Sequence, residues 1–455
     1  MGPSLEGSTV LGIATRPFVI ALTLAAGLAV SAASAQDRRA DATGSIPRAG
    51  AQAMAYAPSG WSGESGASGD PSMTAEAIRA DAANFQGCLA GLWPQAARRG
   101  VQRRTYEALT ASLTPDLRIM DLLDSQPEFT KAVWDYLDVL VTDARIAKGR
   151  ELLARYANVF DAVERAYGVD RHVIAAIWGV ETNYGTIAGS KPVLQSTATL
   201  ACIGRRQAYF RAEFLDALEI VARGDIAPGK LVGSWAGAFG PTQFMPSAFK
   251  RYAVDFDGDG HRDVISSVPD LIASTANNLK KDGWVSGQTW GYEVVVPATF
   301  DFRLSGKAHT MSLAEWQKLD VARPHGLRFA RPDEQAFLLV PAGIQGPGFL
   351  MLRNFRVIMR YNPAEAYALA IGHLADRLRG GGAFAQAWPR YERVLSRAER
   401  LQLQEALQRR GFDVGEPDGR LGARTRDAIR DFQARVGRVP DGFASAGLLE
   451  QLQGR

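Results

Sequence analysis

One apolar helical segment, residues 170–185, constrains the fold more than any other part of the chain. Glu181 continues a stripe of apolar side chains at helical i, i+3 and i+4 spacings, which is formed by Val173, Ile174, Ile177 and Trp178. A helix with this pattern buries its stripe against other elements. Because burial disfavours the charged form of a carboxyl group, we expect a raised pKa for Glu181 and a proton available near neutral pH. A general acid requires this property.

Composition bounds the class of protein around this helix. The 455 residues, 46% of them hydrophobic, leave room for two or three domains with substantial cores. The net charge is only +4 and the pI about 9.0, and the sequence has no run of five basic residues and no zinc-finger spacing. Nucleic acid is therefore a poor candidate partner, whereas an anionic polymer stays open.

The first 35 residues have the pattern of an export signal. An apolar run over residues 18–30 is followed by the small residues Ala33, Ser34 and Ala35, which suit cleavage before Gln36. A membrane anchor is the competing interpretation, but the run is short for a span and no later segment reaches about 18 apolar residues. We expect residues 1–35 to be a signal peptide and the mature protein to lie in the periplasm with no membrane span.

Composition shifts divide the mature chain. Residues 36–74 are rich in Ala, Gly, Ser and Pro and predict a flexible tether. Residues 75–385 form one patterned domain, and the glycines at 380–382 and Pro389 mark its end before a compact unit at 393–455. The expected strands are 291–302 and 336–340, and the expected helices are 103–113, 127–141, 147–167, 171–184, 206–223, 270–282, 362–379, 398–410, 424–436 and 444–453.

Only two cysteines occur, Cys88 and Cys202. An oxidising, exported setting favours a disulfide between them, which would close a loop of more than a hundred residues. Two buried free thiols are the alternative, since sequence does not give their separation.

Three motifs in the large domain carry a resemblance. They are residues 179–185 (GVETNYG), 234–246 (SWAGAFGPTQFMP) and 354–362 (NFRVIMRYN), and together they resemble the lytic murein transglycosylase B family. The last unit, with Leu401–Leu407, Asp418–Gly422 and Ala428–Gln433, resembles the small peptidoglycan-binding domain often appended to wall enzymes. The resemblance implies a mainly α fold with a small β subdomain: a lysozyme-like transglycosylase catalytic domain followed by a compact three-helix peptidoglycan-binding domain.

The resemblance also implies an activity. Such enzymes cleave peptidoglycan glycan strands between N-acetylmuramic acid and N-acetylglucosamine and leave a 1,6-anhydro end. A single glutamate, here Glu181, serves first as acid and then as base, whereas ordinary glycosidases use two carboxylates. A hydrolytic muramidase and a non-catalytic wall-binding protein are the alternatives. The two enzymes differ only in whether water or the 6-hydroxyl group captures the sugar.

The resemblance further implies substrate-binding residues. Gln243 is expected to form a hydrogen bond with an acetamido or hydroxyl group of the substrate. Ser234 is expected to form a hydrogen bond with either the sugar or Glu181. Asn183 and Tyr184 are expected to position the acid or the glycan, although ring packing is the safer interpretation of Tyr184. Tyr361 and Asn362 are expected in the groove, while Tyr367 suits the core equally well. Two adjacent arginines, Arg205 and Arg206, are expected to bind the carboxylates of murein. The alternative is that they lie in solvent at the start of a helix.

Residues 255–263 match the first nine positions of a calcium-binding loop. Asp255, Asp257 and Asp259 would supply oxygens, His261 its carbonyl group, and Asp263 an oxygen directly or through water. Ser266 stands at the twelfth position, where a bidentate glutamate is expected. The sequence predicts a structural Ca²⁺ site, with a metal-free acidic turn as the alternative, and no organic cofactor.

Other enzyme classes lack their motifs. The histidines are scattered and form no H-E-x-x-H pattern, which argues against a zinc peptidase; they are His172, His261, His309, His325 and His373. The sequence also has no G-x-S-x-G elbow and no phosphate-binding P-loop.

Overall fold

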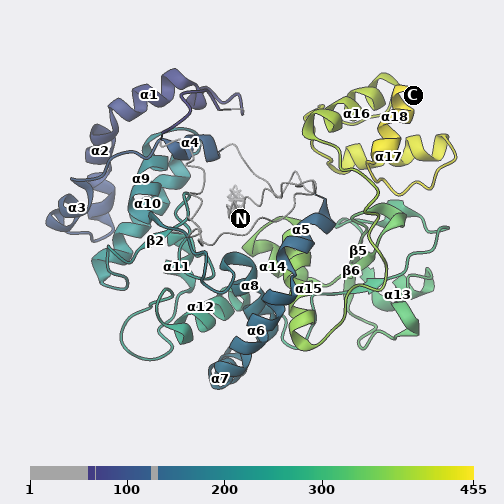
Figure 1. Ribbon diagram of the computed structural model, residues 1–455, viewed down its shortest axis with the longest axis horizontal. Coiled ribbons are helices and arrows are strands. Elements are labelled where there is room, and N and C mark those ends of the chain that lie inside the picture. The colour runs from purple at the N-terminus through teal and green to yellow at the C-terminus, as the bar shows by residue number, and fades with distance from the viewer. Residues whose placement is uncertain (1–59, 67, 124–131, 455) are drawn as a thin grey trace, which may run out of the picture.

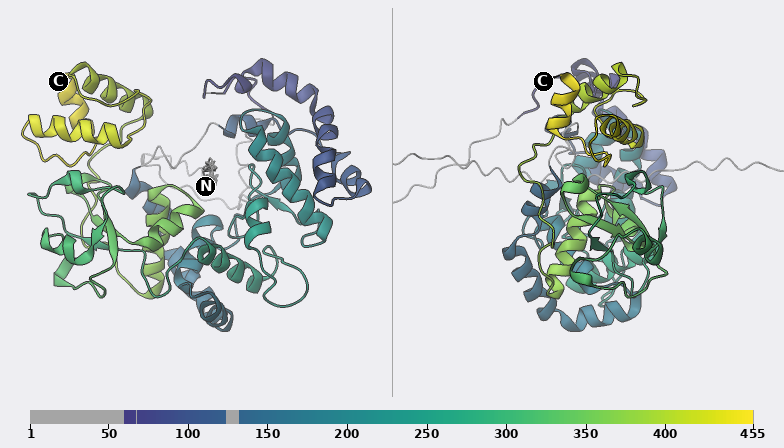
Figure 2. Two further views of the ribbon diagram at one scale, coloured as in Figure 1. Left: turned by 180° about the vertical axis from the view of Figure 1, so that it is seen from behind. Right: turned by 90° about the vertical axis from the view of Figure 1, so that its right-hand side faces the viewer.

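The computed structural model describes residues 60–66, 68–123 and 132–454. Its helices and strands form an arc, with the N-terminal helices at one end and the C-terminal helices at the other (Figure 1; seen from behind in Figure 2). The expected mainly α fold with a small β subdomain is confirmed. The expected signal peptide, residues 1–35, lies outside the described residues.

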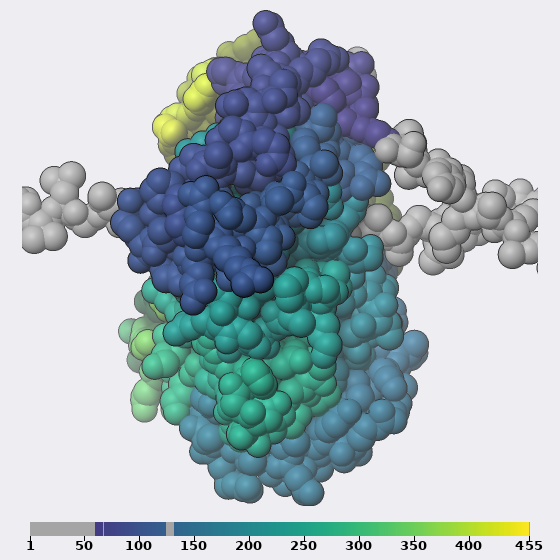
Figure 3. Space-filling view, turned by 90° about the vertical axis from the view of Figure 1, so that its left-hand side faces the viewer, coloured from purple at the N-terminus to yellow at the C-terminus, as the bar shows by residue number. Residues whose placement is uncertain are grey.

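One end of the arc is a helical unit with its own hydrophobic core. Figure 3 shows its first helices packed as a continuous surface above the teal residues of the middle of the chain. The unit consists of α1 (Ala75–Ala83), α2 (Phe85–Arg98), α3 (Arg103–Thr110), α4 (Arg118–Leu123), α9 (Val193–Cys202), α10 (Gln207–Arg223) and α11 (Pro246–Tyr252). A disulfide joins Cys88 on α2 to Cys202 on α9, with the two Cα atoms 6.0 Å apart.

Residues 36–59 of the expected flexible tether lie outside the described residues, and the prediction is wrong for the part that the structure describes. The part of it that the structure describes packs on the N-terminal unit, because Ser62 donates to Asp121, Trp61 lies under the Arg79 guanidinium and Met73 is fully buried. The short 3-10 helix η1 (Pro71–Met73) is capped by Asp70. Composition alone does not reveal these contacts.

The middle of the arc is a second helical unit around a larger core. It contains α5 (Val133–Leu140), α6 (Asp143–Arg155), α7 (Ala157–Tyr167), α8 (Arg171–Thr182), α12 (Val268–Lys281), α14 (Arg353–Tyr361) and α15 (Glu365–Arg379). The helix predicted over 147–167 is instead two helices, because the chain bends at Tyr156, whose ring packs on Trp178 with centroids 6.4 Å apart.

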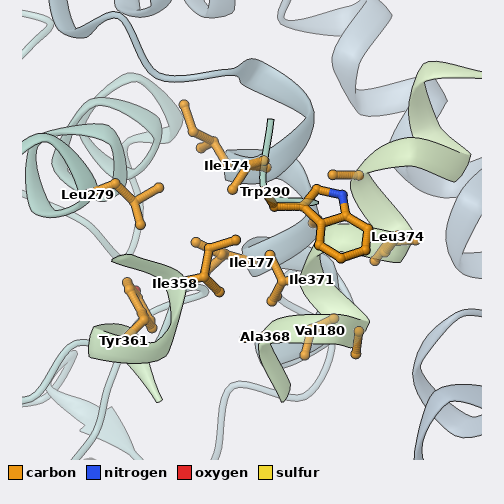
Figure 4. Close-up of a cluster of buried hydrophobic side chains, with 14 of the residues drawn as sticks. Ile174, Ile177, Val180, Leu279, Trp290, Ile358, Tyr361, Ala368, Ile371 and Leu374 are labelled. Atoms are coloured by element: carbon orange, nitrogen blue, oxygen red, sulfur yellow. The ribbon is translucent and has the colours of Figure 1, made fainter. Parts of the chain in front are cut away.

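Helix α8 lies at the centre of this unit. Asp170 caps its first turn by accepting from the His172 N–H, and Asn183 ends it in the left-handed conformation. Every residue from Val173 to Thr182 is buried, so neighbouring helices surround α8 on all sides rather than along one stripe. Figure 4 shows Ile174, Ile177 and Val180 pointing into the core among side chains from α12, α14 and α15.

A four-stranded antiparallel sheet extends from this unit. Its order is β3-β6-β5-β4, with β3 (Gly291–Val294), β4 (Met311–Ser312), β5 (Gln335–Leu339) and β6 (Gly348–Met351). One face of the sheet packs on the core of the central unit. A separate core around Trp316 of α13 (Leu313–Lys318) covers the opposite face of the sheet. The strand predicted over 291–302 ends at Val294, because Pro297 has no N–H to donate and Phe302 begins the 3-10 helix η3 (Phe302–Leu304).

The C-terminal unit has three helices and a separate core, as expected. Ser396 forms a capping box with Glu399 at the start of α16 (Arg397–Arg409), which is followed by α17 (Ala423–Arg435) and α18 (Ala446–Gln453). The unit lies above β5 and β6 in Figure 1, and Arg430 of α17 donates to Ser305, which directly follows η3. Among the described residues, no helix is long and apolar enough to cross a membrane.

Candidate active site

Glu181 lies in the last turn of α8 and is 8% exposed. The phenol of Tyr367, on α15, donates a hydrogen bond of 2.5 Å to its Oε1 atom. The two helices pack against each other although the residues are 186 positions apart. Helix packing thus fixes one carboxylate oxygen and leaves Oε2 for another partner.

Burial raises the pKa of Glu181 to about 7, and the Tyr367 hydrogen bond acts in the opposite direction by stabilising the carboxylate. Among the described residues, no second carboxyl group contributes to this shift. The expectation of a protonated acid near neutral pH is therefore supported by burial in the structure. Such a group can donate a proton and then take one back.

The structure brings the three sequence motifs together around Glu181. The Thr182 hydroxyl donates to the Pro241 carbonyl at 2.6 Å, which ties the first motif to the second. The Tyr361 hydroxyl donates to the Thr242 carbonyl at 2.5 Å, which ties the third motif to the second. The negative charge of Glu181 also contributes to the raised pKa of Tyr361, so the two side chains are neighbours.

Hydrogen bonds within the chain hold the loop of the second motif. The Ser234 hydroxyl accepts from the Ala238 N–H at 3.1 Å, so its hydrogen bond closes the loop; no hydrogen bond joins it to Glu181 among the described residues. Gln243 adopts the left-handed conformation, with φ of 56°, and its amide nitrogen donates to the carbonyl groups of Ala188 and Gly240. Its Oε1 atom is buried and has no partner within the described structure. Gln243 thus offers an acceptor for an N–H or O–H donor.

The other predicted groove residues have mixed surroundings. The Asn183 amide donates to Thr186, and Asn362 accepts from the Ala364 N–H at the end of α14. The Tyr184 ring packs edge-on against Trp178 with centroids 5.8 Å apart, which favours ring packing. Its buried hydroxyl has no partner among the residues that the structure describes.

Arg205 and Arg206 directly precede α10, and neither takes part in the hydrogen bonds described above that join the three motifs. Arg205 donates to the Leu123 carbonyl at 2.6 Å. Arg206 adopts the left-handed conformation before α10, and its guanidinium lies 4.8 Å from the Tyr209 ring centroid. These contacts are those of a helix start packed on the N-terminal unit.

Sequence reasoning missed Tyr367 as a site residue. Its position in an apolar helix is equally typical of a core tyrosine, and it is 3% exposed. The contact with Glu181 depends on how α15 packs on α8, and no local pattern reports that packing. Thr242 was missed for the same reason, since its contribution to the site is a backbone carbonyl.

The predicted calcium loop brings three carboxylates together. Oxygens of Asp255, Asp257 and Asp259 lie within 4.8 Å of one another on the surface. Asp263 is not part of this group, and its Oδ1 accepts from the N–H groups of Ile265 and Ser266. Asp270, fully buried, accepts from the N–H groups of Phe256, Asp257 and Asp263 and so holds the loop from beneath.

Known proteins share this architecture. Residues 84–376 match the family described as Transglycosylase SLT domain, and residues 396–452 match Putative peptidoglycan binding domain. Membrane-bound lytic murein transglycosylase B of Escherichia coli (strain K12) is 31% identical over 296 residues, which cover 61% of this chain and 79% of that protein.

Solved structures of lytic transglycosylases are also similar to this chain. SltB3 from Pseudomonas aeruginosa in complex with NAG-NAM-pentapeptide has a TM-score of 0.78 and 44% identity, covering 81% of this chain and 99% of that chain. The Escherichia coli lytic transglycosylase Slt35 in complex with calcium has a TM-score of 0.56 and 29% identity, covering 65% of this chain and 92% of that chain.

Proposed function

The chain belongs to the Transglycosylase SLT domain family and is a peptidoglycan lytic transglycosylase, and from this premise we propose that Glu181 is its only catalytic acid and base. The observation that carries the proposal is the buried Glu181 carboxyl group, with a pKa of about 7 and a hydrogen bond from Tyr367. The glycan would lie between the second and third motifs.

The reaction needs only one carboxyl group. Protonated Glu181 gives its proton to the glycosidic oxygen between N-acetylmuramic acid and N-acetylglucosamine as the bond from C1 to that oxygen breaks. The Glu181 carboxylate then takes the proton of the muramoyl 6-hydroxyl group while that oxygen bonds to C1. The glutamic acid is regenerated, no water is consumed and the product carries a 1,6-anhydro ring. Tyr367 holds the carboxyl group in place in both steps, as a positioning residue.

The residues of the three motifs offer hydrogen bonds for this substrate. The unpartnered Oε1 atom of Gln243 suits the N–H of an acetamido group or a sugar hydroxyl. Asn183 and Asn362, at the ends of α8 and α14, add side-chain amides. Ser234 supports the loop through Ala238, and Tyr361 supports it through Thr242.

The pH dependence of cleavage tests the role of Tyr367. We expect kcat/KM to fall as the pH rises through about 7, because the first step needs protonated Glu181. In Tyr367→Phe the carboxylate loses a hydrogen bond that stabilises it, so the pKa of Glu181 rises and the fall moves to higher pH. We also expect kcat to drop about tenfold, since the carboxyl group is less firmly oriented. The measurement is a pH–rate profile on purified glycan strands.

Tyr106→Phe is the matched control for this experiment. Tyr106 is also buried and donates a 2.5 Å hydrogen bond, but to the Leu89 carbonyl in the N-terminal unit. It should lose stability by about 1 kcal/mol and keep the wild-type pH profile. An identical profile for wild type and Tyr367→Phe would contradict a positioning role for Tyr367.

We propose that the loop 255–263 binds a structural Ca²⁺ ion. Three carboxylates that lie together on a turn match the oxygen ligands that Ca²⁺ prefers, and Slt35 has been solved in complex with calcium. Asp255, Asp257 and Asp259 would hold the ion and the backbone of His261 lies in the same turn. The hydrogen bonds of Asp263 to Ile265 and Ser266 favour a loop-supporting role for that residue.

Thermal unfolding with and without Ca²⁺ tests this site. We expect Ca²⁺ to raise the Tm, with a gain of about 2.7 kcal/mol at a concentration a hundred times the Kd. Asp257→Asn should remove this response, because it removes a converging charge. Asp263→Asn is the control and should keep it. A wild type whose Tm is the same with Ca²⁺ and with EDTA would contradict the site.

The remaining proposals concern the location of the protein. We propose that residues 1–35 direct export to the periplasm, where peptidoglycan lies, and that the C-terminal unit holds the enzyme on the wall. A second binding unit on the same chain raises the local concentration of substrate at the active site.

A further inference from the structure

A cavity lies where the C-terminal unit meets the rest of the chain. Its volume is about 190 Å³, and its walls come from the start of α5, the end of β5, the start of α15, helix α17 and the loop before α18. Pockets for drug-sized ligands are larger, about 300–1,000 Å³. This cavity therefore suits a small group or the end of a chain rather than a disaccharide.

Contacts between the two units fix the shape of the cavity. The Arg430 guanidinium donates to the Ser305 hydroxyl at 3.0 Å, and Asp441 accepts from the Ile344 N–H at 3.0 Å. An ion pair of 2.8 Å joins Arg303 to Asp431. The C-terminal unit is thus docked on the sheet, and these contacts hold the walls of the cavity in place.

The walls of the cavity contain more positively charged than negatively charged side chains. Three arginines, Arg400, Arg426 and Arg430, line the cavity together with two acids, Glu365 and Asp441. Both acids are already engaged: Glu365 pairs with Lys307 at 2.9 Å, and Asp441 accepts N–H groups of Ile344, Gln433 and Phe443. Arg430 pairs at 2.7 Å with Asp427, which lies outside the wall, and neither acid of the wall pairs with Arg426.

Arg426 and Arg430 stand four residues apart on one face of α17. Arg430 is 7% exposed, and its Nε atom is buried with no partner within the described structure. Burial lowers the pKa of Arg430, and repulsion from the positive charge of Arg426 lowers it further. The attraction of Asp427 acts in the opposite direction. No hydrogen bond or ion pair joins the Arg426 side chain to another described residue. An anion in the cavity would relieve this repulsion and satisfy the buried N–H group.

Apart from Ser305, the side chains of the rest of the wall are apolar. Ala132, Val133, Leu338 and Ala444 lie among its lining residues. A ligand with a carboxylate next to small apolar groups fits both the charge and the volume. The cavity and the active site share helix α15, since Glu365 in the wall of the cavity precedes Tyr367 by two residues.

We propose that this cavity binds the C-terminal carboxylate of a murein stem peptide, with Arg426 and Arg430 as the anion-binding pair and the apolar wall holding a terminal alanine. The proposal rests on peptidoglycan as the substrate and assigns a subsite for its peptide. The stem would extend from a glycan at Glu181 across the start of α15 to the C-terminal unit.

Direct binding to the full mature chain tests the subsite without any cleavage. The probes are a synthetic murein pentapeptide ending in D-alanyl-D-alanine, the same peptide with a C-terminal amide, and sodium acetate, each titrated by calorimetry or NMR. We expect saturable binding of the acid, at least tenfold weaker binding of the amide, and weak binding of acetate. Arg426→Ala should weaken binding of the acid about tenfold, Arg426→Lys should restore part of it, and Arg426→Glu should abolish it.

Arg424→Ala is the matched control, because Arg424 is also exposed on α17 but does not line the cavity. It should bind the acid as wild type does. No saturable binding of the acid by wild type, equal binding of acid and amide, or acetate binding as tightly as the peptide would each overturn the subsite. Because no glycan bond is cut, such a failure leaves the role of Glu181 standing, and an inactive Glu181 leaves the subsite standing.

Discussion

Glu181→Gln should lower the rate of glycan cleavage about 10³-fold, because the amide has no proton to donate and cannot accept one. The side chain keeps its size and can still accept the Tyr367 hydrogen bond, so the helix packing around it is preserved. The measurement is the release of soluble muropeptides from sacculi at fixed enzyme concentration.

Stability of the same variant checks that the loss is chemical. The pKa of Glu181 is raised from 4.5 to about 7 in the folded chain, so the folded state binds the proton more tightly than the unfolded state. The stability this contributes is present below pH 4.5 and is lost as the pH rises through about 7. Since an amide does not ionise, Glu181→Gln should be at least as stable as wild type at pH 8.

Glu213→Gln is the matched control for burial. Glu213 is 2% exposed, and burial raises its pKa too, but it accepts from the N–H and hydroxyl groups of Ser247 at the start of α11. It should lose about 1–2 kcal/mol of stability and keep the wild-type rate per folded molecule. Loss of activity equal to that of Glu181→Gln would mean that neither glutamate is specifically catalytic.

Replacing Cys88 and Cys202 by serine should have the largest effect on stability. The disulfide joins residues 114 positions apart, and closing a loop of this length restricts the unfolded chain by about 5 kcal/mol in the loop-entropy model. It also ties α2 to α9 within one core, so the N-terminal unit should unfold first. The measurement is denaturant unfolding of oxidised wild type and the double variant.

Reduced wild type is the control for that experiment, because it has the same sequence without the cross-link. It should unfold at the same denaturant concentration as the double serine variant, and both should keep glycan cleavage below their transitions, since Glu181 belongs to the central unit. A stability loss below about 1 kcal/mol would mean that the cross-link does not constrain the unfolded chain as the loop length requires.

Sequence periodicity predicted most helices of the central and C-terminal units and the position of Glu181 within α8. It did not predict α9, whose residues are all buried except Gln195, so that the helix has almost no polar face. It also missed α14, although Phe355, Ile358 and Met359 stand there at helical spacing. The bend at Tyr156, whose ring packs on Trp178 of another helix, was also missed, because no local pattern reports such a contact. Local patterns report local structure, and tertiary contacts decide the rest.

In the candidate site, too, the sequence predicted features local to one helix and missed those that depend on contacts between helices. The burial of Glu181 followed from its neighbours on one helix, whereas the hydrogen bond from Tyr367 depends on packing between α8 and α15. The direction of the Gln243 amide could not be read from its motif: its nitrogen bonds the protein's own backbone, and only Oε1 remains for a ligand. The cavity at the C-terminal unit requires two units of the chain to dock and has no sequence signal.

Mass spectrometry of muropeptides released from sacculi tests the central claim most directly. If Glu181 alone serves as acid and then as base, wild type should release 1,6-anhydro products, each lighter by one water molecule than the corresponding reducing muropeptide. Glu181→Gln should release almost none. Reducing ends from wild type, or anhydro products from Glu181→Gln at the wild-type rate, would contradict the account.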